Sequence, residues 1–211
     1  MSSILKVDEI QDTSGNNIIN ENANTITVGA SGDTITIPSG ATLDGSNATL
    51  SGFATTNGIT MAEQWRLSAV LLCNNLNADT DVTANLEKVD TDSPGTIGTG
   101  MTESSGVFTF PSTGIYLILN NYSFNTAAGG SPFHGLMTRV TTDNSSYSYA
   151  TENYVMISSN WNNGSSSFIF DVTNTSTHKV KFTYYVNGET NLRGNTSSNH
   201  THFTFIRLGD T

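Results

Sequence analysis

After about residue 63, short apolar runs alternate with turn-forming segments, and this succession constrains the fold more than any other feature of the chain. The intervening segments, among them TDSPGTIGTG, PSTG, TAAGGSP and NWNNGSS, carry the Gly, Pro, Asn and Ser that favour turns. The runs that read as strands are 66–73, 84–89, 106–110, 115–124, 134–142, 152–158, 167–172, 179–186 and 202–208. Their number and spacing predict an all-β fold, an antiparallel jelly-roll sandwich. A capping-box pattern, Thr60 followed by Glu63, leaves a short helix at 61–72 as an alternative.

Composition excludes several functional classes. Charged residues make up 12% of the chain, the formal net charge is −10, and the Lys and Arg residues are scattered singly. Nucleic acid is therefore not an expected partner, because binding phosphates requires clustered cations. The single cysteine, Cys73, lies in the apolar run SAVLLC and reads as a buried hydrophobic residue rather than a nucleophile. We expect neither a signal peptide nor membrane insertion, because the N-terminal residues lack an apolar region and no segment could span a bilayer.

Alternation along two late runs assigns their side chains to a core face and an opposite face. In KVKFTYYV, the residues predicted to face the core are Val180, Phe182, Tyr184 and Val186. In the last run, Phe203 and Phe205 are predicted to face the core. The opposite face of that run is predicted to carry His200, His202, Thr204 and Ile206.

Residues 1–62 differ from the rest of the chain. They contain one aromatic residue, Phe53, and a loose repeat in which TITVGASG at 25–32 is echoed by TITIPSG at 34–40, and ATLDG by ATLSG. Each unit predicts a short strand closed by a turn, and so thin a ribbon needs stacked repeats or other chains to cover its apolar side chains. The prediction is a β-repeat attachment stalk at 1–62, with a disordered leader as the alternative, followed by a head domain at 63–211.

The segment ESSGVFTFPSTGIYLILNNYSF, residues 103–124, resembles the signature of the complement component 1q and tumour-necrosis-factor jelly roll. In that family a Gly-x-Phe strand, a Pro-Gly turn and a Gly-x-Tyr strand follow one another. The corresponding residues here are Gly106, Phe108, Pro111, Gly114 and Tyr116. The late KVKFTYYVNG and the terminal HFTFIRLGD agree with the resemblance, which covers about residues 63–211.

The opening SSILKVDEIQDTSGNNII and the thin repeats after it resemble the leaders of bacteriophage tail-fibre and virion appendage proteins, especially marine ones. A jelly-roll head behind such a leader implies a homotrimer located in the virion, whose residues 1–62 bind other virion proteins and form a trimeric stalk. The departure from the animal family is the missing collagen-like Gly-x-y stalk, which argues against a complement or cytokine role. Tail and capsid locations remain open, because both use such leaders.

His200 and His202 form a His-x-His pair, which is half of a cupin metal signature. The chain lacks the Glu that should follow, which disfavours a cupin oxygenase. The resemblance implies that the closing strand lies near a threefold axis, where three pairs would supply six imidazoles to a transition metal; ordinary packing or exposure of the histidines is the alternative.

Two other metal or catalytic readings rest on carboxylates. The pairs DTD at 79–81 and at 90–92 could bind calcium, with solvated loops as the alternative. Glu87, Asp90 and Asp92 are the nearest candidates for glycoside hydrolysis of the depolymerase type. The head is small for such an enzyme, so we assign no catalytic residue and no cofactor.

The segment NWNNGSS is the best candidate for receptor or glycan binding. It places Trp161 beside Asn160, Asn162 and Asn163, and an aromatic ring can stack on a sugar while amides bond its hydroxyls. Packing of Trp161 under its own loop or against a neighbouring subunit is the alternative. The leading hypothesis is a non-enzymatic homotrimeric phage fibre whose head attaches to a host-surface receptor or glycan. The alternatives are a capsid decoration protein without a receptor role, a carbohydrate-binding module, and a metal-dependent enzyme or depolymerase.

Overall fold

The computed structural model of the chain describes residues 9–11, 13–14, 17–22, 25–28, 31–41, 58–92, 95–125, 133–156 and 160–211. The chain divides into two compact units, Met1–Ala54 and Thr55–Thr211, and each is described by itself. We call the second one the head unit. The boundary predicted at residue 62 falls inside its first strand, β4 (Met61–Leu67).

The first unit contains a three-stranded antiparallel sheet in the order β1 (Glu9–Gln11), β2 (Asn17–Asn22) and β3 (Thr25–Val28). The first copy of the predicted repeat supplies β3. The strand predicted for the second copy is wrong, because residues 33–38 form no strand, and the repeats near residues 43 and 50 lie outside the described residues. Ile26, Val28, Ile35 and Ile37 are all exposed in the single chain. In the single chain these four apolar side chains of the first unit are therefore uncovered.

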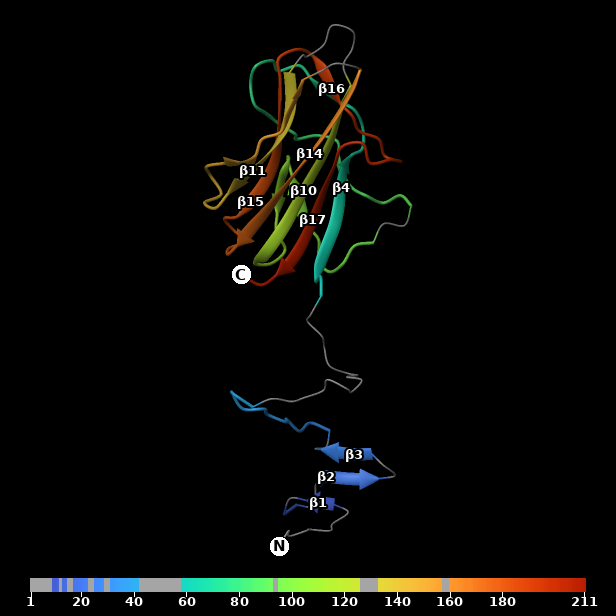
Figure 1. The fold of residues 1–211 in the computed structure, drawn as a ribbon, viewed down its shortest axis with the longest axis vertical. Coiled ribbons are helices and arrows are strands. Elements are labelled where there is room, and N and C mark those ends of the chain that lie inside the picture. The colour runs from blue at the N-terminus through green and yellow to red at the C-terminus, as the bar shows by residue number, and fades with distance from the viewer. Residues whose placement is uncertain are drawn as a thin grey trace. The chain divides into compact units, whose positions relative to one another are not determined.

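The head unit is a sandwich of two seven-stranded antiparallel sheets, which Figure 1 shows as overlapping layers. We call the first one sheet I. Its strands are β4, β5 (Leu71–Cys73), β7 (Leu86–Lys88), β10 (Gly114–Asn125), β14 (Trp161–Val172), β16 (Thr190–Leu192) and β17 (His202–Gly209). The order is β5-β16-β10-β17-β4-β7, and β14 pairs with β10 along its whole length.

Sheet II contains the remaining strands of the head unit. They are β6 (Thr80–Asp81), β8 (Thr102–Ser104), β9 (Val107–Thr109), β11 (Phe133–Thr141), β12 (Ser148–Thr151), β13 (Tyr154–Met156) and β15 (Lys179–Val186). The order is β12-β11-β15-β9-β8, with β13 paired to β11 and β6 paired to β15. The described residues form no helix, and hence none that could cross a membrane. The helix left open at 61–72 is therefore wrong, because that segment forms β4 and β5.

The core between the two sheets confirms the faces predicted from alternation. Val180, Phe182, Tyr184 and Val186 are buried, as are Phe203 and Phe205. Phe182 and Phe203 stack across the sandwich with ring centroids 3.7 Å apart. Phe108, the aromatic residue of the Gly-x-Phe pattern, contacts both of these rings as well as Phe205 and Trp65. The aromatic residues that the sequence singled out thus form the centre of the head.

A carboxylate is also buried at the edge of this core. Glu63, which is 3% exposed, accepts hydrogen bonds from Trp65 Nε1 at 2.8 Å and from the backbone N–H of Met101. Its second oxygen lies 2.6 Å from Lys88 Nζ. A Cβ at Gly100 would lie 1.9 Å from that same oxygen, so a larger residue there would displace the Glu63 carboxylate. The clamp fastens the loop before β8 to β4, because each buried oxygen of Glu63 holds a donor from another segment.

Candidate functional site

The outer side of sheet I carries an apolar row that crosses four strands. Ile169 on β14 lies opposite Leu117 on β10, which lies opposite Ile206 on β17, which in turn lies opposite Ala62 on β4. Alternation places all four side chains away from the core, since their neighbours Tyr116, Ile118, Phe170 and Phe205 are buried. Ile169 is 60% exposed. This row, with Ile115 and Leu119 on either side of Leu117, is called the apolar band.

Beyond Leu119 the same outer side becomes polar. Asn121 on β10 is flanked by Ser165 and by His202, and His202 lies opposite Arg66 on β4. The last pair of the β10–β14 ladder joins Asn125 to Trp161. The outer side of sheet I therefore changes from aliphatic at one end to amide, imidazole and indole at the other.

Trp161 and its asparagines do not form the loop that the sequence predicted. Trp161, Asn162 and Asn163 belong to β14, which begins at Trp161 rather than at Ser167. Pairing with the long β10 supplies the backbone hydrogen bonds that a turn would otherwise leave open. Trp161 and Asn163 face outward, and Asn160 is exposed just before the strand. Alternation turns Asn162 to the other side, together with Gly164, whose missing side chain makes room for the Tyr122 ring. The predicted set therefore splits between two faces.

Trp161 is 51% exposed, and a cation lies against it. The guanidinium carbon of Arg193 is 3.7 Å from the centroid of the indole ring, and Nη2 of Arg193 lies 3.1 Å from Nε2 of His200. Ser123 Oγ accepts from Nη1 of the same guanidinium at 3.4 Å. Arg193, which the sequence did not single out, thus orients both a predicted glycan-binding residue and a predicted metal ligand. Its only signal in the sequence was its place in the loop LRGNTSSNH.

The two histidines have different surroundings. Burial and the charge of Arg193 lower the pKa of His200. Burial also lowers the pKa of His202, and this effect is larger than that of a backbone hydrogen bond with Asn199, which raises it. Both imidazoles therefore favour the neutral form, which a metal requires. Among the described residues of one chain, no group of three His, Cys, Asp or Glu side chains could hold a metal ion. The contact with Arg193 also places a positive charge beside Nε2 of His200, where a metal cation would be repelled.

Four of the carboxylates considered for calcium or hydrolysis, Asp79, Asp81, Glu87 and Asp90, contact the protein's own cations. Arg66, fully buried, donates to Glu87 at 2.7 Å and to Asp90 at 2.8 Å. Lys181 Nζ lies 2.7 Å from Asp81, which also accepts from Thr183. Asp79 accepts from Tyr149 and lies 3.8 Å from Arg139 Nη1. These ion pairs give Glu87 and the two DTD segments a structural role in tying loops to the sheets.

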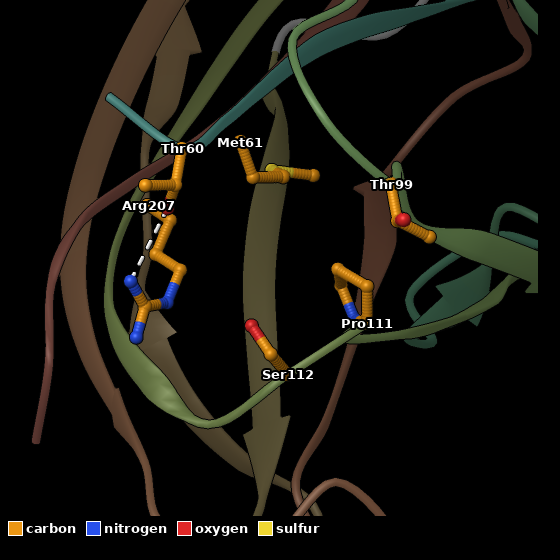
Figure 2. A pocket seen from close by; sticks show the side chains of 6 residues that line it. All are labelled: Thr60, Met61, Thr99, Pro111, Ser112 and Arg207. Carbon is orange, nitrogen blue, oxygen red and sulfur yellow. Dashed lines mark hydrogen bonds between the residues drawn. The ribbon is translucent and has the colours of Figure 1, made fainter. Parts of the chain in front are cut away.

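A pocket of about 360 Å³ opens where β4 begins and β17 ends. Figure 2 shows its lining residues, Thr60, Met61, Thr99, Pro111, Ser112 and Arg207. The Arg207 guanidinium donates to Thr60 Oγ1, as the dashed line in Figure 2 marks, and also to Thr113 O and to Asp210. Its donors are thus directed at protein acceptors, and none of the residues that the sequence singled out as a binding or metal site lines the pocket.

The comparisons with known proteins concern the fold. Neither family models nor curated protein sequences gave a match to this chain. The Eiger TNF structure from S. frugiperda superposes with a TM-score of 0.55 at 12% identity, covering 73% of this chain and 96% of that one. The crystal structure of murine APRIL at pH 8.0 superposes with a TM-score of 0.51 at 13% identity, covering 70% of this chain and 98% of that one. PRD1 vertex protein P5 superposes at 18% identity and covers 72% of this chain and 99% of that one. Its TM-score of 0.46 is too low to support an argument. At these identities the likeness concerns architecture alone, and it shows that the head unit is an antiparallel jelly roll with the tumour-necrosis-factor-like fold.

Proposed function

We propose that the protein is a homotrimeric, non-enzymatic structural protein of a bacteriophage virion. It would be a fibre of the tail or capsid, with residues 1–62 attached to other virion proteins and the head in contact with the host surface. The observation that carries the proposal is the apolar band on sheet I, an aliphatic surface that one chain covers only in part.

The band supports a trimer for two reasons. Ile169 is exposed, and Leu117, Ile206 and Ala62 are partly exposed. Such a continuous apolar row across four strands is typical of an interface, whereas singly scattered side chains are not. The tumour-necrosis-factor-like fold supplies the symmetry, because the resemblance noted in the sequence implies three chains packed through the sheet that contains the closing strand, here β17. The exposed isoleucines of the first unit would be covered by the same threefold association.

The virion location is supported by the order of the two parts. A β-repeat leader that resembles those of phage appendages precedes a compact head, and the two are separate units. Electron microscopy of intact particles, with the protein tagged at its C-terminus, tests the location. Label at the particle surface in multiples of three copies would support it, and protein absent from particles would refute it.

The receptor role centres on the polar end of sheet I. Trp161 presents an exposed indole beside Asn160 and Asn163, with Arg193 on one face of the ring. Trp161→Ala is expected to weaken adsorption of particles to host cells while the chain mass in solution stays trimeric. Unchanged adsorption with intact trimers would instead favour a decoration protein without a receptor role.

A further inference from the structure

The outer side of sheet II carries an aromatic cluster that the proposed function does not use. Phe133 on β11 and Tyr154 on β13 stack with ring centroids 4.7 Å apart and planes inclined by 17°. Tyr185 on β15 meets both of them edge-on, at 5.9 Å and 6.1 Å. All three residues are half-buried, so part of each remains at the surface. We call these residues the aromatic platform.

A glycine makes the platform possible. Gly135 on β11 lies opposite both Tyr154 and Tyr185 in the two ladders. A Cβ there would come within 2.6 Å of Cδ1 of Tyr154 and 2.3 Å of the Asn153 carbonyl oxygen. The absence of a side chain lets the Tyr154 ring lie across β11 towards Tyr185. The rings are therefore held in place by the ladder and not only by their mutual contacts.

Oxygen acceptors surround the edge of the platform. The hydroxyl of Tyr154 donates to Glu152 Oε1 and that of Tyr185 to Asn77 Oδ1, each at 3.4 Å, a length at which a ligand hydroxyl competes easily. Burial and the nearby charges of Glu152 and Asp79 raise the pKa of Tyr154 to about 12, so its hydroxyl stays a donor at neutral pH. Glu152 and Asn77 are exposed.

We propose that the aromatic platform, with Asn77 and Glu152 at its edge, binds a neutral saccharide. Ring faces pack against the C–H face of a hexose, and carboxylate and amide oxygens accept from its hydroxyls. The choice of a host saccharide rests on the proposed function, whereas the platform itself does not. The outer sides of the two sheets point in opposite directions, so this surface stays accessible when the apolar band is buried.

The charges on this face favour a neutral sugar over an acidic one. Arg139 and Lys181 lie further along the same side, but each contacts an Asp, at 3.8 Å and 2.7 Å. Tyrosine rings also cover them, with Arg139 4.6 Å from the Tyr149 ring and Lys181 4.3 Å from the Tyr147 ring. A quaternary ammonium would need rings that stand apart around it, and here Phe133 and Tyr154 are in stacking contact.

Affinity electrophoresis tests the proposal with the full chain, in gels cast with mannan, galactan or dextran as neutral polymers and with alginate as an acidic one. We expect at least one neutral polymer to retard the protein. Tyr154→Ala and Tyr185→Ala should weaken its apparent affinity by about tenfold. Tyr185→Phe keeps the ring and should retain most of the retardation, and Glu152→Gln, at an exposed position, tests the edge without altering the platform.

Several results would overturn the proposal. These are no retardation by any neutral polymer, retardation by alginate alone, competition by choline, or unchanged binding in variants that keep the parent's melting temperature. Trp161→Ala separates this proposal from the receptor role. If Trp161→Ala abolishes retardation and the platform variants do not, the platform is excluded and the receptor role stands. If the parent protein has monomer mass and the platform variants abolish its retardation, saccharide binding by the platform stands and the proposed trimer is excluded.

Discussion

Ile169→Asp tests the trimer at the most exposed side chain of the apolar band. Ile169 is 60% exposed in one chain, and full burial of an isoleucine stabilises by about 1.5 to 3 kcal/mol. Burial of the remaining fraction would therefore contribute about 1 to 2 kcal/mol per chain, or about 3 to 5 kcal/mol for three chains. Loss of that contribution lowers the association constant of the trimer by a factor of about 10² to 10⁴, and an unpaired carboxylate in the interface would lower it further.

Sedimentation velocity over a range of protein concentrations measures the effect. The parent is expected at three times the chain mass of 22.5 kDa, and Ile169→Asp should dissociate at concentrations where the parent remains trimeric. Met156→Asp is the matched control, because Met156 is 77% exposed but lies on β13 of sheet II, away from the band. A parent of monomer mass at every concentration, or equal dissociation of Ile169→Asp and Met156→Asp, would refute the assignment of the interface.

Three further predictions concern the head unit. Glu63→Ala leaves the Trp65 and Met101 N–H donors without their acceptor. In urea titrations it should lower the free energy of unfolding by about 2 to 5 kcal/mol. A loss under about 1 kcal/mol would show that the contacts of Glu63 are dispensable. The pKa of His202 is lower in the folded than in the unfolded state, so the unfolded state binds more protons and stability should fall as the pH drops below about 6.5. His202→Gln should flatten that fall, and identical urea midpoints for both proteins at pH 7 and pH 5 would contradict the assignment. Burial raises the pKa of Cys73 to about 12, so its thiol should stay unreactive to a disulfide reagent at pH 8 until urea unfolds the chain; rapid reaction of the native protein would show that β5 opens.

In the late strands of the head unit, the structure confirms the core faces predicted from alternation. KVKFTYYV occupies β15 from end to end, and its inward residues and those of β17 are buried, because a strand between core and solvent must alternate if it is to bury one face. The predictions from local turn chemistry were weaker. NWNNGSS reads as a turn by composition, yet pairing with β10 makes its residues from Trp161 onward the start of β14. The polar strands β6, β8, β12 and β16 carry too few apolar residues to show a period, and only their partners define them.

The candidate sites show the same division. By itself, the sequence determined the all-β class, the core faces of the late strands and the outward side of His202, since these depend on residue types at a period of two along the chain. Only the tertiary structure decided which residues meet. It aligned Ile169, Leu117 and Ile206 into one band, laid Arg193 against Trp161, and gathered Phe133, Tyr154 and Tyr185 around Gly135. Such contacts join strands far apart in sequence, and their register follows from long-range pairing and packing rather than from any local pattern of residues.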